Sequence, residues 1–241
     1  MQNKQRTKRI RKPAIVVFSI LLAMYVFNSC SESTLELDAS RLGLEYFPLE
    51  VGQYRIYEVD EILYSISSFD TLNYQLRESV TDSFTNVENG TTFTIQREKR
   101  TNATEEWLLD SLWTARKTNS TAISVENNQA LVKLIFPIEN NLEWDSNVLN
   151  AASQKIFIYN TNLADTTLAG ESLADLVEVI QSDIEENIVN RDQRSEIYAR
   201  NIGLVIKTGI TLSFCTVDCP DQKTIESGRY IHQTLTSYGV E

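Results

Sequence analysis

The sequence predicts an all-β fold, arranged as a curved antiparallel meander sheet or open barrel with one helix near residues 184–200. From Tyr46 onward, apolar and polar residues alternate, and β-branched and aromatic residues are frequent. These stretches are joined by turns of about two to six residues, which favour antiparallel neighbours over parallel crossovers. A two-sheet β-sandwich is the alternative architecture.

Individual strands follow from the alternation and from the turn residues between them. Asn89-Gly90 separates two alternating stretches and predicts a two-residue hairpin turn with positive φ at both positions. Asn127-Asn128 is a second pair that tolerates the left-handed region. The expected strands cover residues 53–67, 72–86, 91–99, 106–117, 121–126, 130–136, 155–160, 173–181, 204–215 and 223–237.

Residues 184–200 are the one stretch with helical character. Ile184, Ile188 and Val189 recur near helical spacing, and charged residues fill most of the remaining positions. A shorter helix over residues 191–200 is the alternative. Gly203 then predicts a tight turn into the next strand.

The N-terminal segment has the pattern of a secretory leader. Six basic and no acidic residues lie in the first twelve positions, an apolar stretch covers residues 14–27, and Ser29-Cys30 follows. This cysteine resembles the lipobox of bacterial lipoproteins, which implies cleavage before Cys30 and acylation of its thiol. An uncleaved anchor helix is the alternative, although a bilayer span needs about 20 apolar residues. The expected organisation is a signal peptide over 1–29, a lipidated tether over 30–45 and one β-rich domain over 46–241.

Charge excludes one class of partner. The chain has 22 basic and 33 acidic residues, and removal of residues 1–29 takes away six basic ones, so the mature charge is 16 − 33 = −17. Phosphate backbones repel so acidic a protein, and nucleic acid is therefore not an expected partner.

Cys215 and Cys219 are the two cysteines beyond Cys30. Their spacing of four and an oxidising compartment favour a disulfide. Two free buried thiols and a metal site remain as alternatives, although no histidine lies nearby to complete a metal site.

No catalytic constellation stands out. His232 is the single histidine, it lies in an expected strand, and there is no Gly-x-Ser-x-Gly motif. A zinc site normally needs more than one histidine, so we expect no metal, no cofactor and no enzymatic activity. Trp107, Trp113 and Trp144 are interpreted as core residues, with sugar stacking or an apolar pocket as the alternative.

Three parts of the chain carry a family resemblance, namely residues 46–54, residues 107–116 with 131–137, and residues 197–205. They resemble uncharacterised exported lipoproteins of Bacteroidota, and the resemblance implies a β-rich envelope protein without implying an activity. It also implies O-glycosylation where Asp is followed by Ser or Thr and then by a small or aliphatic residue, at Thr71, Ser111 and Thr166. Thr71 and Thr166 are expected in loops.

The function expected from these features is that of a cell-envelope lipoprotein acting as a structural or interaction module. The alternative is a binding protein that holds a lipid or another apolar ligand in the pocket of its curved sheet. Lipid on Cys30 would hold the protein at a membrane, and the residues after it favour the outer membrane, with the face left open.

Overall fold

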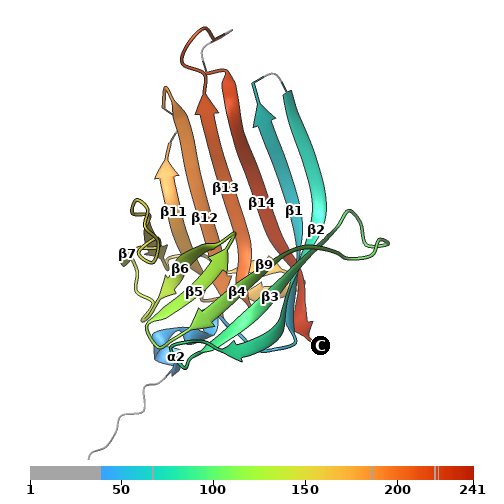
Figure 1. The fold of residues 1–241 in the computed structure, drawn as a ribbon, viewed down its shortest axis with the longest axis vertical. Helices are drawn as coiled ribbons and strands as arrows, with labels where there is room; N and C mark the ends of the chain where they lie inside the picture. The colour runs from blue at the N-terminus through green and yellow to red at the C-terminus, as the bar shows by residue number, and fades with distance from the viewer. Residues whose placement is uncertain (1–38, 67, 186, 220, 222) are drawn as a thin grey trace, which may run out of the picture. The chain divides into compact units, whose positions relative to one another are not determined.

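The computed structural model describes residues 39–66, 68–185, 187–219, 221 and 223–241, which form a nearly all-β unit (Figure 1). A short helix α2 (Ala39–Leu42) and a 3-10 turn η1 (Leu44–Tyr46) come first. The strands follow as β1 (Gln53–Ser65), β2 (Ser68–Thr85), β3 (Thr91–Arg100), β4 (Leu108–Lys117), β5 (Thr121–Glu126), β6 (Gln129–Ile135), β7 (Glu143–Asp145), β8 (Ile156–Asn160), β9 (Thr166–Leu168), β10 (Glu171–Leu173), β11 (Val177–Ile184), β12 (Asn190–Ala199), β13 (Gly203–Phe214) and β14 (Ile225–Val240).

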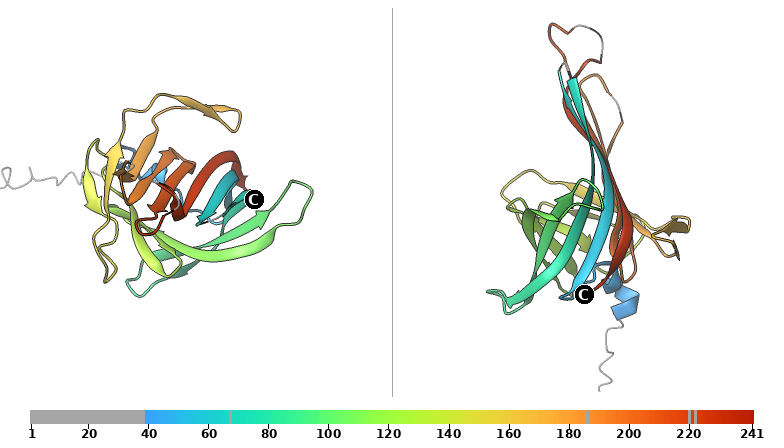
Figure 2. Two further views of the ribbon diagram at one scale, coloured as in Figure 1. Left: turned by 90° about the horizontal axis from the view of Figure 1, so that it is seen from above. Right: turned by 90° about the vertical axis from the view of Figure 1, so that its right-hand side faces the viewer.

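Twelve of these strands form one antiparallel sheet in the order β6-β5-β4-β3-β2-β1-β14-β13-β12-β11-β8-β7. The sheet curls until its two ends meet, as the view from above shows (Figure 2). Trp144 Nε1, on β7, donates to the carbonyl of Val132 on β6 at 2.8 Å, and the Val132 amide donates to the Ser146 carbonyl at 2.9 Å. The predicted curved sheet or open barrel is thus confirmed, and the sandwich alternative is not adopted.

Two regions of this sheet differ in how much of it is covered. In the closed region, β3 to β6 curl over the lower parts of β1 and β11–β14. In the open region, the ends of three long hairpins extend beyond that cover (Figures 1 and 2). We define the open region as residues 61–72 of β1–β2, 181–193 of β11–β12 and 209–229 of β13–β14.

Side chains fill the closed region. One cluster contains Trp144, Phe157 and Tyr159 from the β7–β8 end of the sheet, packed with Leu134 from β6 and Tyr198 from β12. The Trp144 ring lies 4.5 Å from that of Tyr159, centroid to centroid. A second cluster joins residues of β1, β2, β13 and β14 to the segment that carries β9 and β10.

The folded unit begins before residue 46, within the expected tether. Leu42 and Leu44 pack against the first cluster, and Tyr46 is buried. Lys117 Nζ holds this segment by donating to the carbonyls of Leu44 at 2.7 Å and Phe47 at 2.8 Å. Burial lowers the pKa of Lys117, against the opposing effect of Glu45.

The helix predicted over residues 184–200 is wrong, because these residues form the end of β11, a turn and β12. Ile184, Ile188 and Val189 are exposed at the turn and share no buried face. In β12, alternate side chains Glu196 and Tyr198 are buried. The two-residue period was hidden because the buried side of this strand is polar.

Turn residues behave largely as predicted. Asn127 and Asn128 both have positive φ, at 50° and 64°. The hairpin after β2 is confirmed, but its two-residue turn is not. The Asn86 amide donates to the Gly90 carbonyl across a longer loop, and within that loop Asn89 adopts positive φ. Among the described residues, no helix is long and apolar enough to cross a membrane.

Candidate binding site inside the curved sheet

Cross-strand pairing defines the side chains that face the inside of the curve. Glu196 on β12 pairs with Lys207 on β13, and Lys207 pairs with Gln233 on β14. Gln233 pairs in turn with Val59 on β1. Directly paired residues lie on the same face of a sheet, so these four side chains form one row across the inner face. The row lies where the closed region gives way to the open region.

A buried ion cluster spans the interior at this level. Lys133 reaches from β6 to Glu196 on β12, with Nζ 2.8 Å from the carboxylate, and its Nζ also lies 3.2 Å from Glu126. Lys207 Nζ is 3.2 Å from Glu196, and the Tyr198 hydroxyl donates to Glu196 at 2.7 Å. The side chain of Glu196 is 1% exposed and that of Lys133 is 7% exposed. These contacts link opposite walls of the curved sheet.

The cluster keeps its charges despite burial. Burial alone would raise the pKa of Glu196, but Lys133, Lys207 and the hydroxyl of Tyr198 outweigh it and lower that pKa. Burial would likewise lower the pKa of Lys133, but Glu126 and Glu196 reverse the direction and raise it. Burial, with the adjacent Glu196, raises the pKa of Tyr198. The carboxylate and the ammonium are therefore both ionised at neutral pH, and Tyr198 is a neutral donor.

An inner cavity of about 70 Å³ lies against this cluster. Its apolar lining includes Phe47, Leu49, Ile95 and Trp113. Four cationic and three acidic side chains also line it, namely Arg55, Arg97, Lys133 and Lys207 with Glu78, Glu126 and Glu196. The cavity is thus neither filled by aromatic rings nor purely apolar.

A mouth pocket of about 220 Å³ adjoins the inner cavity, because Glu126, Lys133, Glu196 and Lys207 line both. It is lined by five cationic and two acidic side chains, the cations being Lys133, Lys155, Arg194, Lys207 and Arg229. Carboxylates beside the pocket pair with two of these cations, since Asp192 contacts Arg194 and Glu61 contacts Arg229. Counting all four carboxylates, the local charge is 5 − 4 = +1 in a strongly acidic chain.

Two cations of the inner cavity, Arg97 and Arg55, are held by other parts of the fold. Arg97 stacks on Trp113, with its guanidinium carbon 3.8 Å from the ring centroid, and its Nε donates to Glu78 at 3.0 Å. Arg55 donates from NH1 to the carbonyl of Ile202 at 2.9 Å. These contacts hold the cationic side chains against the cavity wall.

Three buried nitrogen donors around the inner cavity have no acceptor among the described residues. They are Nε2 of Gln233, Nε1 of Trp113 and Nε of Arg55. Gln233 is 3% exposed. Most buried donors in proteins are hydrogen-bonded, so three around one cavity make it a candidate site for a guest with acceptor atoms.

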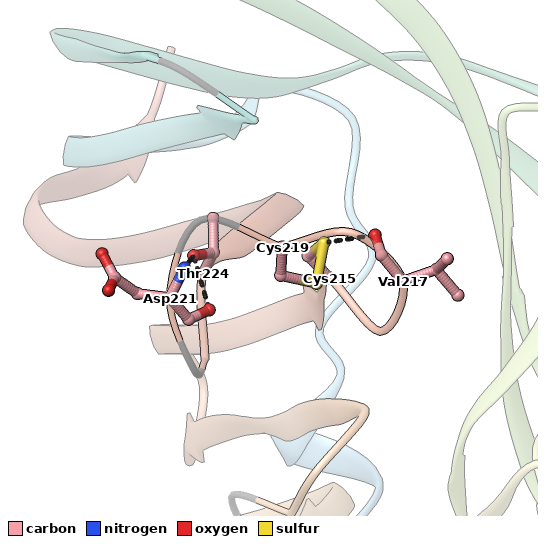
Figure 3. The surroundings of a disulfide bond; sticks show 5 residues. All are labelled: Cys215, Val217, Cys219, Asp221 and Thr224. Carbon is pink, nitrogen blue, oxygen red and sulfur yellow. Dashed lines mark hydrogen bonds between the residues drawn. A yellow bond between two sulfur atoms is a disulfide. The ribbon is translucent and has the colours of Figure 1, made fainter.

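The structure contains the disulfide predicted between Cys215 and Cys219, in the connection from β13 to β14 (Figure 3). Their Cα atoms are 5.7 Å apart. The loop is also held by the Thr224 hydroxyl, which donates to the carbonyl of Asp221 at 2.9 Å. It lies at a tip of the open region (Figure 1), and neither cysteine lines the inner cavity.

The three predicted glycosylation sites do not line the inner cavity. Cys30 falls outside the described residues. Thr71 is exposed in β2, Ser111 is half-buried in β4, and Thr166 lies in β9, so Thr71 and Thr166 are not in the expected loops. Glycosylation at these three positions stays a prediction.

His232, Trp107 and Trp144 make contacts that are typical of residues with a structural role. The two ring nitrogens of His232 contact the hydroxyls of Thr208 at 3.3 Å and Thr234 at 2.9 Å. Trp144 is buried in the core, as predicted, and Trp107 lies under the guanidinium of Arg100. Trp113 differs, because it lines the inner cavity. Within the described part of the chain, no three metal-ligand side chains come together.

Sequence reasoning missed the ion cluster, although one signal was present. Lys133 interrupts an apolar strand between Val132 and Leu134, and all three are buried. A lysine inside such a strand indicates a buried carboxylate partner. The partner could not be named, because Glu196 was assigned to a helix and lies 63 residues away in sequence.

Two solved structures are similar to this chain at low sequence identity. A solved structure from Bacteroides fragilis, provisionally described as an exported protein with a YmcC-like fold, is 12% identical, with a TM-score of 0.41. One from Parabacteroides distasonis, provisionally described as a lipoprotein, is 10% identical, with a TM-score of 0.44. Each match covers 80% of this chain and 98% of the other. No family model and no curated protein matches the sequence. At these values, the assignment to an exported lipoprotein family rests on the sequence.

Proposed function

We propose that the protein is an exported lipoprotein, held in the cell envelope by lipid on Cys30, and that it acts there as a non-catalytic module that binds a protein partner. The basic, then apolar, then cysteine pattern of the leader supports the anchor. The outer membrane is the proposed site, since the residues after Cys30 favour it.

One observation carries the interaction role, and it is the composition of the hairpin tips. Three hairpins that are neighbours in the sheet end in exposed apolar side chains (Figure 1). These are Ile66 at 58% exposure, Phe69 at 65%, Ile188 at 83%, Val189 at 53% and Val217 at 75%. Apolar side chains gathered at one end of a soluble surface are typical of a contact site for another molecule.

The position of α2 supports a partner that lies away from the anchoring membrane. The described chain starts at α2, at the end of the sheet opposite the three tips (Figure 1). A tether that enters at α2 leaves the tips free to point outward. An apolar ligand inside the sheet finds less support, because charged side chains line both pockets.

Two measurements test the proposal. Cys30→Ser is expected to move the protein from the membrane fraction to the soluble envelope fraction, and retention in the membrane would contradict the lipid anchor. For the partner, a photoreactive residue at Ile188 is compared in living cells with one at Val240, which is 64% exposed at the opposite end. A specific crosslinked band from position 188 alone supports tip binding. Equal or absent crosslinking at both positions contradicts it.

A further inference from the structure

The inner cavity shows a mismatch between donors and acceptors. Gln233, Trp113 and Arg55 each present a buried nitrogen without an acceptor among the described residues, and all three side chains line the same space. A donor that loses water on folding and finds no acceptor destabilises the protein. The cavity thus favours a guest that brings oxygen acceptors.

The charge around the cavity narrows the chemistry of that guest. Four cations and three carboxylates line it, so the lining has a formal charge of 4 − 3 = +1. The mouth pocket that leads to it is also lined by more cations than acids. A negatively charged guest fits both spaces better than a cationic one.

The size of the cavity and its apolar lining limit how large the guest can be and what its uncharged part is made of. The cavity volume is about 70 Å³, whereas one water needs about 10–15 Å³ of such space. Phe47, Leu49 and Ile95 provide an apolar wall opposite the polar groups. A charged head with a few carbon atoms therefore suits the space, and a long acyl chain does not.

We propose that the inner cavity binds a small monocarboxylate with a short apolar body, whose carboxylate accepts hydrogen bonds from Gln233, Trp113 and Arg55. The site goes beyond the interaction role of the hairpin tips and does not depend on it. The mouth pocket adjoins this cavity, and Lys133 and Glu196, which form an ion pair, line both spaces.

The test measures binding of butyrate to the purified full chain by calorimetry, with butyramide as the uncharged probe and inorganic phosphate as an anion without an apolar body. Butyrate is expected to bind and the other two probes to bind weakly or not at all. Trp113→Phe removes the N–H and keeps a smaller aromatic ring, and Gln233→Met removes the amide at similar size. Each is expected to weaken butyrate binding about 10- to 100-fold, as befits a hydrogen bond to a charged group.

Trp107→Phe is the matched control, because Trp107 stacks on Arg100 and does not line the cavity. Its butyrate affinity is expected to equal that of the wild type. Thermal unfolding shows whether each variant is folded. If Gln233→Met does not fold, Trp113→Phe alone tests the hydrogen-bond donors. The proposal would be overturned if butyrate did not bind the wild type and a crystal structure showed only ordered water on the three donors. Butyramide binding as tightly as butyrate would also overturn it, and so would an equal butyrate affinity in all the variants.

Discussion

The closed and open regions share β1, β2 and β11–β14, yet they differ in what covers these strands. In the closed region, the inner face is buried under β3 to β6 and packs aromatic and aliphatic side chains. In the open region, the same inner face carries Glu61 paired with Arg229, and Asp192 paired with Arg194 at the edge of the region. Whether β3 to β6 cover the inner face, rather than which strand a residue belongs to, thus decides whether the side chains there are apolar or charged. The ion cluster around Glu196 lies at the boundary, where a charge is already buried but still faces charged neighbours.

The largest effect is expected where a buried charge loses its partner. Glu196→Ala leaves Lys133 buried with Glu126 alone, and the free energy of unfolding is expected to fall by about 3–5 kcal/mol. Urea unfolding followed by circular dichroism measures this. Glu139→Ala, which removes an exposed carboxylate in the closed region, is the control and is expected to change stability by less than about 0.5 kcal/mol.

The same carboxylate makes stability depend on pH. The folded-state pKa of Glu196 lies below its usual value of 4.5, so its contribution is complete above that pH and is lost as pH falls through the folded-state pKa. The wild type is therefore expected to lose stability more steeply below pH 4.5 than Glu196→Ala does. Parallel curves would show that this carboxylate is not stabilised in the folded protein.

The next largest difference in stability is expected between two variants in which an aliphatic side chain is shortened to alanine, one in each region. Leu134 is fully buried in the closed region, so Leu134→Ala is expected to cost about 2–5 kcal/mol. Ile184 is 46% exposed at a tip of the open region, and Ile184→Ala is expected to cost less than about 1 kcal/mol. Midpoints of urea unfolding give both values. Similar losses would mean that the tips are packed in solution and that the division into two regions is wrong.

The smallest effect is expected from the disulfide at the tip. It closes a very short loop, and the chain-entropy account gives at most about 2 kcal/mol for such a loop. Replacing both Cys215 and Cys219 with Ser is expected to speed amide exchange in residues 214–225 and to leave exchange in β5 and β6 unchanged. Faster exchange throughout the sheet would instead show that the two regions unfold as one unit.

Prediction from sequence succeeded where one face of a strand is apolar. Residues 53–65 alternate clearly, and the burial of β1 follows that pattern. Residues 121–126 form the expected strand β5, although three consecutive residues in it are all buried. It failed at β12, where Glu196 and Arg194 occupy inner positions, so that the periodicity did not reveal which face is buried. The short strands β7 and β9 have three residues each and carry too few positions for a pattern.

The candidate site could not be predicted for a related reason. Its residues come from β1 to β6 and from β12, β13 and β14, and only the curl of the sheet brings them together. Lys133 inside an apolar strand indicated a buried charge, but a single sequence does not name the partner. The disulfide was predictable because Cys215 and Cys219 are near neighbours in the chain.

The meeting of β6 and β7 has a consequence for how the protein behaves at high concentration. Unpaired edges of a sheet are templates on which other chains can add strands and aggregate. Here the Val132 amide and carbonyl are both bonded to the β7 end, and the hydroxyl of Tyr159 bonds both the amide and the carbonyl of Ile135. Each end of the twelve-stranded sheet blocks the other. At Val132 and Ile135 the sheet therefore offers no free backbone groups to which another chain could add a strand.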